Sequence, residues 1–381
     1  MKLSFREEEL AFEKDVVQFV DEHWPETIRS GRASLEFARR WFDALVAKGW
    51  SVPQWPTSMG GTDWTPTQKF IWERTVARAE APTWDPCGTA LAGPLLYSFG
   101  NHHQRERFLP GIRALQARWC HSFAARDPTR IEVLAVRRGE RYFASGRVVE
   151  VVGASDSDYM MGLIRTDPSQ RAEAGLSLCI VDLHGDGIAV EGMTVTLDEV
   201  VVADAELLGD ESQGWNCAVA VLDHERTAVR RVTSVRVQLD KLKNLLSRTP
   251  DGNGLMLDQD EDLCRKVAAI DVQLMSLEGL ELRVLSDLAR GAVPGPEASV
   301  LQIKGGELAI QVGELIVESL GYYAMPYPDE HLLDNEGPIG PGYALPAIRG
   351  MLFGRSWSAY SGNPELERDR VAERILGPQK S

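Results

Sequence analysis

The spacing of hydrophobic residues changes twice along the chain. Up to residue 118, apolar side chains recur at the spacing of an amphipathic helix, as Val16, Phe19 and Val20 do. From 119 to 208 the pattern consists of short runs rich in β-branched residues, with turn residues between them. After residue 214 the helical spacing returns and continues toward the C-terminus. The sequence therefore predicts helices, then a sheet, then helices.

The middle part of the chain is predicted to be a small antiparallel β-domain. Its expected strands are, in chain order, RYFASG, VVEVVG, YMMGLIRT, GLSLCIVDL, GIAVEG and VEGMTVTLDEVVV.

Breaks within the two helical parts predict where helices end. In the N-terminal part, the string SVPQWPTSMGGTDWTP forbids a continuous helix and predicts a structured turn. In the C-terminal part, TPDGNG and VPGPE separate long helical segments, which we expect to be antiparallel neighbours in a bundle. We expect an N-terminal helical domain (1–118), a central β-domain (119–214) and a C-terminal four-helix bundle that also mediates oligomerisation (215–381).

The oligomerisation prediction depends on apolar positions that occupy more faces of one C-terminal helix than a single core needs. These positions are Leu277, Leu280, Val284, Leu285 and Leu288.

Charge and cysteine content exclude several classes of protein. The 381 residues hold 41 basic and 56 acidic side chains, and a net charge of -15 repels nucleic acid and anionic membranes. The charged N-terminus lacks the apolar core of a signal peptide, so we expect a cytoplasmic protein. The five cysteines are scattered singly without a C-x-x-C pair, which predicts reduced thiols and no metal site.

Four strings in a fixed order carry a resemblance to a known family. They are WPTSMGGTDWTP, ELLGDESQGW, LDHERTAVRR and YSGNPELERDRVAERILG. With them the chain resembles the acyl-CoA dehydrogenase family over essentially its full length. Within that family it is similar to the large subunit of pimeloyl-CoA dehydrogenase and to the subunits of steroid side-chain dehydrogenases. The resemblance implies the family's fold, FAD as cofactor and an acyl-CoA substrate in lipid or steroid catabolism.

The resemblance also implies a catalytic base. Family members remove an α-proton from the acyl-CoA with a desolvated carboxylate, which many of them carry in a Tyr-Glu-Gly string. Here that string reads Tyr360-Ser361-Gly362, so the usual base is absent. Other members place the base on a C-terminal helix at a Glu-Arg pair, which matches Glu225 and Arg226. Glu225 is therefore the candidate base; the alternative is a carboxylate paired on a helix face.

Two residues beside the candidate base match family positions that touch the CoA moiety. They are Asp223 and Arg226. Arg226 has a second interpretation, as a structural partner of Glu225 or of a helix C-terminus.

The positions that match the family's flavin contacts carry unexpected residue types. Phe123 and Ala124 stand where a hydroxyl-bearing residue is expected, and Glu150-Val151 replaces a Trp-Thr or Trp-Ser pair. Asn363 matches a family Thr or Ser near the flavin, and a capping role is its alternative. A carboxylate beside a reduced flavin is electrostatically unfavourable. We therefore expect this chain alone to bind FAD weakly or not at all.

Three hypotheses of function follow. In the first, the chain is an FAD-dependent acyl-CoA dehydrogenase for a bulky or branched acyl chain, with Glu225 as base. It then works as a homo-dimer or as a hetero-tetramer with a paralogue. In the second, it is a non-catalytic subunit that has lost its flavin site and partners an active paralogue. In the third, it is a flavin-free lyase or binding protein that reuses the CoA cleft.

Overall fold

The computed structural model describes residues 5–25, 35–123, 129, 131–170, 172–225, 230–292, 295–327, 340–360 and 364–377. The chain forms two compact units, each built from separate stretches of sequence. The helical unit comprises Met1–Val20, Thr65–Glu80 and Arg226–Ser381. The sheet unit comprises Asp21–Trp64 and Ala81–Glu225. Domain boundaries at 118 and 214 remain a prediction, because the two units group the N-terminal helices differently.

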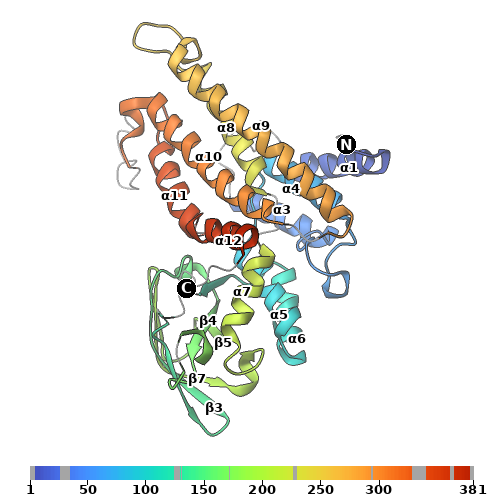
Figure 1. Ribbon diagram of the computed structural model, residues 1–381, viewed down its shortest axis with the longest axis vertical. Coiled ribbons are helices and arrows are strands. Elements are labelled where there is room, and N and C mark those ends of the chain that lie inside the picture. Colours follow the sequence, from blue (N-terminus) through green and yellow to red (C-terminus); the bar gives the residue numbers. More distant parts are fainter. Residues whose placement is uncertain are drawn as a thin grey trace. The chain divides into compact units, whose positions relative to one another are not determined.

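The sheet unit contains all strands found in the described residues. They are β1 (Trp119–Ser122), β2 (Leu134–Arg138), β3 (Arg141–Val148), β4 (Tyr159–Arg165), β5 (Leu176–Asp182), β6 (Ile188–Glu191), β7 (Thr194–Ala203) and β8 (Leu207–Leu208). Their order is β6-β7-β3-β2-β4-β5-β8, with β1 paired to β4. In Figure 1, β3 and β7 run side by side as a long pair. The predicted order of helices, sheet and helices is confirmed.

The sheet differs from the predicted one in two respects. It is not purely antiparallel, because β4 pairs in parallel with both β1 and β2. The string VVEVVG is not a strand, so that prediction is wrong. Strand β3 ends at Val148, and Glu150 takes a left-handed conformation with φ of 62°. The Val151 N–H then donates a hydrogen bond to the Met193 carbonyl at 2.9 Å. This bond joins two loops and is not part of the hydrogen-bond ladder between strands.

The sheet unit also contains helices. They are α3 (Leu35–Lys48), α5 (Gly93–Phe99), α6 (His102–Arg113) and α7 (Gly214–Glu225), with a π-helix η2 (Cys87–Ala92) and a short 3-10 turn η1 (Thr57–Met59). Helix α6 begins at Asn101, whose side chain forms a reciprocal capping box with Gln104. The Gln104 Nε2 also donates to the Leu207 carbonyl at 2.9 Å, which joins the start of α6 to β8.

The predicted turn before residue 65 has a structural reason for its glycines. Gly60 ends η1 with φ of 91°, a conformation that side chains with a Cβ rarely adopt. A Cβ on Gly61 would lie 1.9 Å from the Trp55 carbonyl oxygen. The turn then passes to Thr65, which caps the next helix with Gln68. In this chain, the glycine pair shapes the backbone.

The helical unit contains α1 (Glu7–His23) and α4 (Pro66–Arg78) together with the C-terminal helices. These are α8 (Arg230–Leu246), α9 (Glu261–Ala289), α10 (Glu297–Leu320), α11 (Ala347–Tyr360) and α12 (Pro364–Leu376). The predicted segments near 261–290 and 297–320 therefore exist as α9 and α10. Asp260 starts α9 by accepting the N–H groups of Asp262 and Leu263.

The apolar positions behind the oligomerisation prediction do not form an exposed surface. Leu277, Val284 and Leu285 are buried within the chain, with 5%, 6% and 6% exposure. Leu280 and Leu288 are half-buried. Leu277, Val284 and Leu285 therefore belong to the core of this chain, and the expectation that they face a second chain is wrong. Oligomerisation itself stays a prediction.

Candidate functional site

The strand that leads to the predicted flavin position is anchored at its start by Asp85. The Asp85 carboxylate accepts the backbone N–H of Trp119, the first residue of β1, at 2.7 Å. It also accepts the N–H groups of Cys87 and Gly88, at 3.0 and 2.9 Å, at the start of the π-helix η2. Desolvation raises the pKa of Asp85 to about 6, and the three N–H bonds oppose that shift. One carboxylate thus links η2 to β1.

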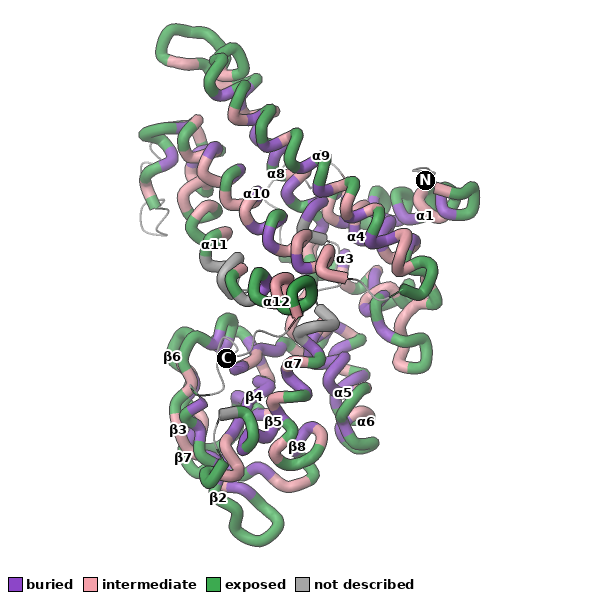
Figure 2. Tube along the Cα trace, in the orientation of Figure 1, coloured by how far each residue is buried: buried purple, intermediate pink, exposed green. Residues whose placement is uncertain are grey.

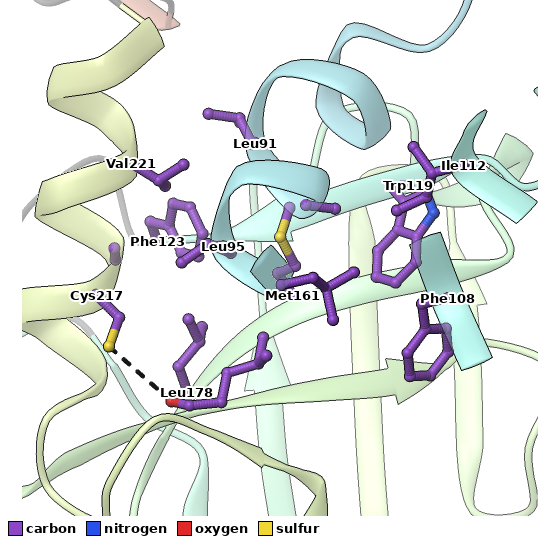
Figure 3. Close-up of a cluster of buried hydrophobic side chains, with 14 of the residues drawn as sticks. Leu91, Leu95, Phe108, Ile112, Trp119, Phe123, Met161, Leu178, Cys217 and Val221 are labelled. Atoms are coloured by element: carbon purple, nitrogen blue, oxygen red, sulfur yellow. Dashed lines mark hydrogen bonds between the residues drawn. The ribbon is translucent and has the colours of Figure 1, made fainter. Parts of the chain in front are cut away.

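Phe123, which follows β1 directly, is buried in an apolar core. It is 2% exposed, and its ring stacks on His121 with 4.5 Å between centroids. Figure 3 shows Phe123 beside Val221 of α7 and Leu95 of α5, in the same cluster of buried residues. A phenyl ring therefore fills the space at the end of β1, and it offers no hydrogen bond. Ala124, the next matched position, lies outside the described residues.

The residue that precedes Phe123 in the chain, Ser122, carries a hydroxyl group. Strand residues alternate between the two faces of a sheet, so Ser122 lies on the opposite face from Phe123. Ser122 is 5% exposed, and its Oγ has no hydrogen-bond partner among the described residues. A hydroxyl is therefore present next to the matched position, on the other side of the strand.

The second pair of flavin positions lies in the loop after β3. Val151 is fully buried in the sheet core, a cluster that also holds Val133, Val195 and Leu197. Glu150 is exposed and is held in its left-handed conformation beside Val151. Neither residue supplies an aromatic ring or a hydroxyl.

The described flavin positions do not fit a flavin ring. The side chains of Phe123 and Val151 are packed inside hydrophobic cores, and Glu150 places a negative charge beside Val151. A flavin needs hydrogen-bond donors and acceptors along its polar edge, and none of these three side chains is a donor.

Two of the predicted site residues, Asp223 and Glu225, lie at the end of α7. The backbones of Asp223 and Glu225 belong to the last turn of this helix. Their side chains lie outside the described residues, as do Arg226 and Asn363. The start of α7 is fixed, because a Cβ on Gly214 would lie 2.3 Å from the Leu178 backbone nitrogen. Cys217 and Val221 bury the inner face of the helix in the same core as Phe123 (Figure 3).

Two further carboxylates of the C-terminal helices are engaged in surface ion pairs. Glu318 of α10 pairs with Lys266 of α9. Glu365 of α12 is 75% exposed and pairs with Arg368 at 2.5 Å.

A buried carboxyl group in the helical unit was missed by the sequence. Glu281 of α9 is 3% exposed, and its Oε1 has no hydrogen-bond partner among the described residues. Burial, together with the nearby Glu278 carboxylate, raises the pKa of Glu281 to about 8, and the Arg74 cation opposes the shift. The apolar neighbours of Glu281 along the helix were the available signal, since a carboxylate within such a stripe faces the core.

No group of histidine, cysteine, aspartate or glutamate side chains suited to a metal ion occurs in the part of the chain that the structure describes. Within the same part, no helix has both the length and the apolar character needed to cross a bilayer.

Comparisons with known proteins identify the family. The model of the acyl-CoA dehydrogenase N-terminal domain matches residues 6–115, and that of the C-terminal domain matches residues 212–376. The chain is 27% identical over 369 residues to the acyl-CoA dehydrogenase IpdE1 of Mycobacterium tuberculosis, covering 90% of this chain and 89% of IpdE1. It is 29% identical over 287 residues to FadE29 of the same organism, covering 71% and 73%.

Solved structures share the fold. The ChsE4-ChsE5 complex from M. tuberculosis and the Tcur3481-Tcur3483 steroid ACAD each superpose with a TM-score of 0.79 at 21% identity. Each comparison covers 100% of both chains. PigA, solved with FAD and proline, has a TM-score of 0.76 at 12% identity, covering 99% of this chain and 100% of PigA. Two domain models in the expected order, together with full-length relatives, leave one assignment: the chain belongs to the acyl-CoA dehydrogenase family.

Proposed function

We propose that this chain is one subunit of a heteromeric acyl-CoA dehydrogenase, and that the flavin is held by a paralogous partner subunit. The observation that carries the proposal is the burial of two residues at the positions that match the family's flavin contacts. Phe123 is 2% exposed and Val151 is fully buried, so both belong to cores of this chain. Two similar solved structures are complexes of paired chains, ChsE4-ChsE5 and Tcur3481-Tcur3483, which supports a pairing here.

In this proposal the chain contributes to the CoA side of the assembly. Asp223 and Arg226 bind the CoA moiety near the end of α7, where the anionic substrate needs a cation. The acyl group is bulky, as in steroid side chains, because one similar structure is a steroid ACAD. The net charge of -15 makes a local cation such as Arg226 more important for binding the polyanionic CoA.

A second candidate is that the chain is itself catalytic, with Glu225 as the base. The observation in its favour is the hydroxyl of Ser122, buried next to Phe123 without a partner among the described residues. In this version Glu225 takes the α-proton of the thioester, and desolvation of the site raises its basicity.

The visible spectrum distinguishes the two candidates. The chain is purified alone, incubated with excess FAD and desalted, and the absorbance near ~450 nm is compared with the protein concentration. The same measurement follows co-expression with an acyl-CoA dehydrogenase paralogue from the same organism as the proposed partner. We expect no bound flavin on the chain alone and a flavin in the co-purified complex. One tightly bound FAD per chain without a partner would overturn the proposal and favour the second candidate.

A further inference from the structure

Arg74 of helix α4 attaches the N-terminal helix α1 to the helical unit. Its guanidinium forms an ion pair with Glu13 of α1. It also lies over the rings of Phe5 and Phe70, at 5.0 and 5.5 Å from their centroids, and these two rings meet edge to face. Figure 2 shows buried residues along α4, the helix that carries Arg74. One cation thus joins the start of the chain to the interior of this unit.

A second carboxyl group, that of Glu281, lies near Arg74 across the contact between α4 and α9. Glu281 is 3% exposed, whereas the Glu13 side chain is 27% exposed. The Oε1 atom of Glu281 and the Nε atom of Arg74 are both buried, and neither has a hydrogen-bond partner among the described residues. A carboxyl oxygen and a guanidinium N–H are therefore left unused on neighbouring helices.

The other charged groups of the surrounding helices are engaged with one another. The pairs are Arg236–Glu278, Arg236–Asp271 and Lys243–Asp271 between α8 and α9, Arg283–Glu297 between α9 and α10, and Lys304–Glu307 on α10. On α4, Arg78 interacts with Glu13, Glu278 and Asp240. The Glu278 carboxylate disfavours ionisation of Glu281, and Arg74 is the cation that favours it. An ionised Glu281 would therefore have Arg74 as its counter-ion.

The geometry of such a pair is already present in the same cluster. A guanidinium binds a carboxylate most strongly through two parallel N–H bonds. Arg236 binds Glu278 in this way, donating from Nε and Nη2 to the two carboxylate oxygens at 2.8 and 3.0 Å. The Nη2 of Arg74 bonds instead to Glu13. Because no hydrogen bond joins Arg74 to Glu281 in this structure, forming that pair requires the guanidinium to move toward α9, which weakens its contacts with α1.

We propose that Arg74 exchanges between two carboxylates: it holds α1 through Glu13 while Glu281 is protonated, and it turns to Glu281 once that group ionises, which loosens α1. The cost of a buried, unpaired charge drives the exchange, since Glu13 is more exposed and is solvated by water when its partner leaves. The chemical event is the release of one proton from Glu281 to solvent. Burial raises the pKa of Glu281 to about 8, so the attachment of α1 weakens as the pH rises through that value.

The exchange involves neither a flavin nor a partner subunit, so it stands apart from the proposed function. It also differs from the effect of Glu281 on overall stability, because a single element, α1, responds. Failure of the proposed function would appear in the visible spectrum, whereas failure of the exchange would appear in the protection of α1.

The test measures amide hydrogen exchange of the full chain at about pH 6.5 and about pH 9, with each rate divided by the intrinsic rate at that pH. The protection of α1, over residues 10–20, is then compared with that of α10, over residues 305–315, in the same unit. This ratio cancels any change in the stability of the unit as a whole. We expect the ratio to fall by ~10-fold between the two pH values, because α1 loses a partly buried ion pair and a cation–π contact. An unchanged ratio in the parent chain would overturn the exchange.

Three variants identify the groups responsible. Glu281→Gln cannot ionise, so its ratio should stay constant with pH. Glu13→Gln lacks the carboxylate of α1, so its ratio should be low at both pH values and fall no further. The matched control Asp262→Asn neutralises an exposed carboxylate of α9 that pairs with Lys266 at 2.8 Å, and it should behave as the parent chain does. A fall that persists in Glu281→Gln or Glu13→Gln, or one that disappears in Asp262→Asn, would contradict the exchange.

Discussion

Asp85 holds the backbone N–H of Trp119 at 2.7 Å, across 34 positions of sequence. This bond connects the π-helix η2 to the first strand, while two further N–H groups of η2 bond to the same carboxylate. A π-helix is rare and often occurs near functional sites. Asp85 therefore fixes the position of the strand that ends at Phe123.

We expect Asp85→Ala to destabilise the chain by about 3 kcal/mol, because three backbone N–H groups lose their acceptor. Urea unfolding followed by tryptophan fluorescence measures the change, and hydrogen exchange should show faster exchange at Trp119. Asp167→Ala is the matched control, since Asp167 accepts the Ser169 N–H in an exposed turn. Equal stability of the two variants would show that Asp85 is not an anchor.

The buried carboxyl of Glu281 should make stability depend on pH. Its folded-state pKa of about 8 lies above the ordinary value of 4.5, so the folded state holds the proton more tightly. The stability from this group is complete below about pH 4.5 and is lost as the pH rises through 8. Between pH 7 and 9 the loss is roughly 1 kcal/mol.

The variant Glu281→Gln should remove this dependence, because an amide does not ionise. We expect it to be more stable than the parent chain at pH 9 and to lose less stability between pH 7 and 9. Glu278→Gln is a useful comparison, since Glu278 is paired with Arg236 at 2.8 Å and its loss should destabilise at both pH values. Parallel pH profiles for the parent and Glu281→Gln would refute a protonated Glu281.

A substitution at Val151 tests whether the loop after β3 has lost the ability to contact a flavin. We expect Val151→Thr to cost about 1–3 kcal/mol, because the new hydroxyl enters a fully buried apolar position. Val149→Thr serves as the control, since Val149 is 48% exposed. Urea unfolding compares the two variants, and FAD titration should show no gain of binding in either. A neutral Val151→Thr that binds FAD would mean that the loop still forms a cofactor contact.

The candidate base is tested by Glu225→Gln, a nearly isosteric change. If the assembled protein is active through this chain, we expect turnover to fall by ~10²–10⁴-fold, as for a lost general base. Glu365→Gln should leave turnover near the parent value, because Glu365 is exposed and paired with Arg368. The assay uses the assembled complex and an artificial electron acceptor. Unchanged turnover in Glu225→Gln would show that Glu225 is not the base and would favour its alternative role as a carboxylate paired on a helix face.

The sequence predicted the order of elements well because periodicity is a local property. Helices α9 and α10, and strands β3 to β7, coincide with segments whose apolar spacing is strong over many residues. The failure at VVEVVG has a tertiary cause, since Val151 is drawn into the sheet core through its bond to Met193. The parallel pairings of β4 join strands that are distant in sequence, and spacing within one strand carries no information on its neighbour.

The candidate site was predictable only as far as residue types could be matched. Resemblance located Phe123 and Val151, but their burial in cores depends on helices and strands from elsewhere in the chain. The sequence also gave no sign of Asp85 as an anchor, because its partner Trp119 lies in another element. The assignments of Glu225, Asp223, Arg226, Ala124 and Asn363 remain predictions.

Packing around Phe123 has a consequence for how this protein is maintained in a cell. A typical flavoprotein gains stability from its bound cofactor and unfolds more readily when the vitamin is scarce. Here a phenyl ring, made with the chain itself, contributes the apolar contacts at the end of β1. On the proposed division of labour, riboflavin starvation would leave this subunit folded and abundant. The supply of functional complex would then follow the partner's access to the vitamin.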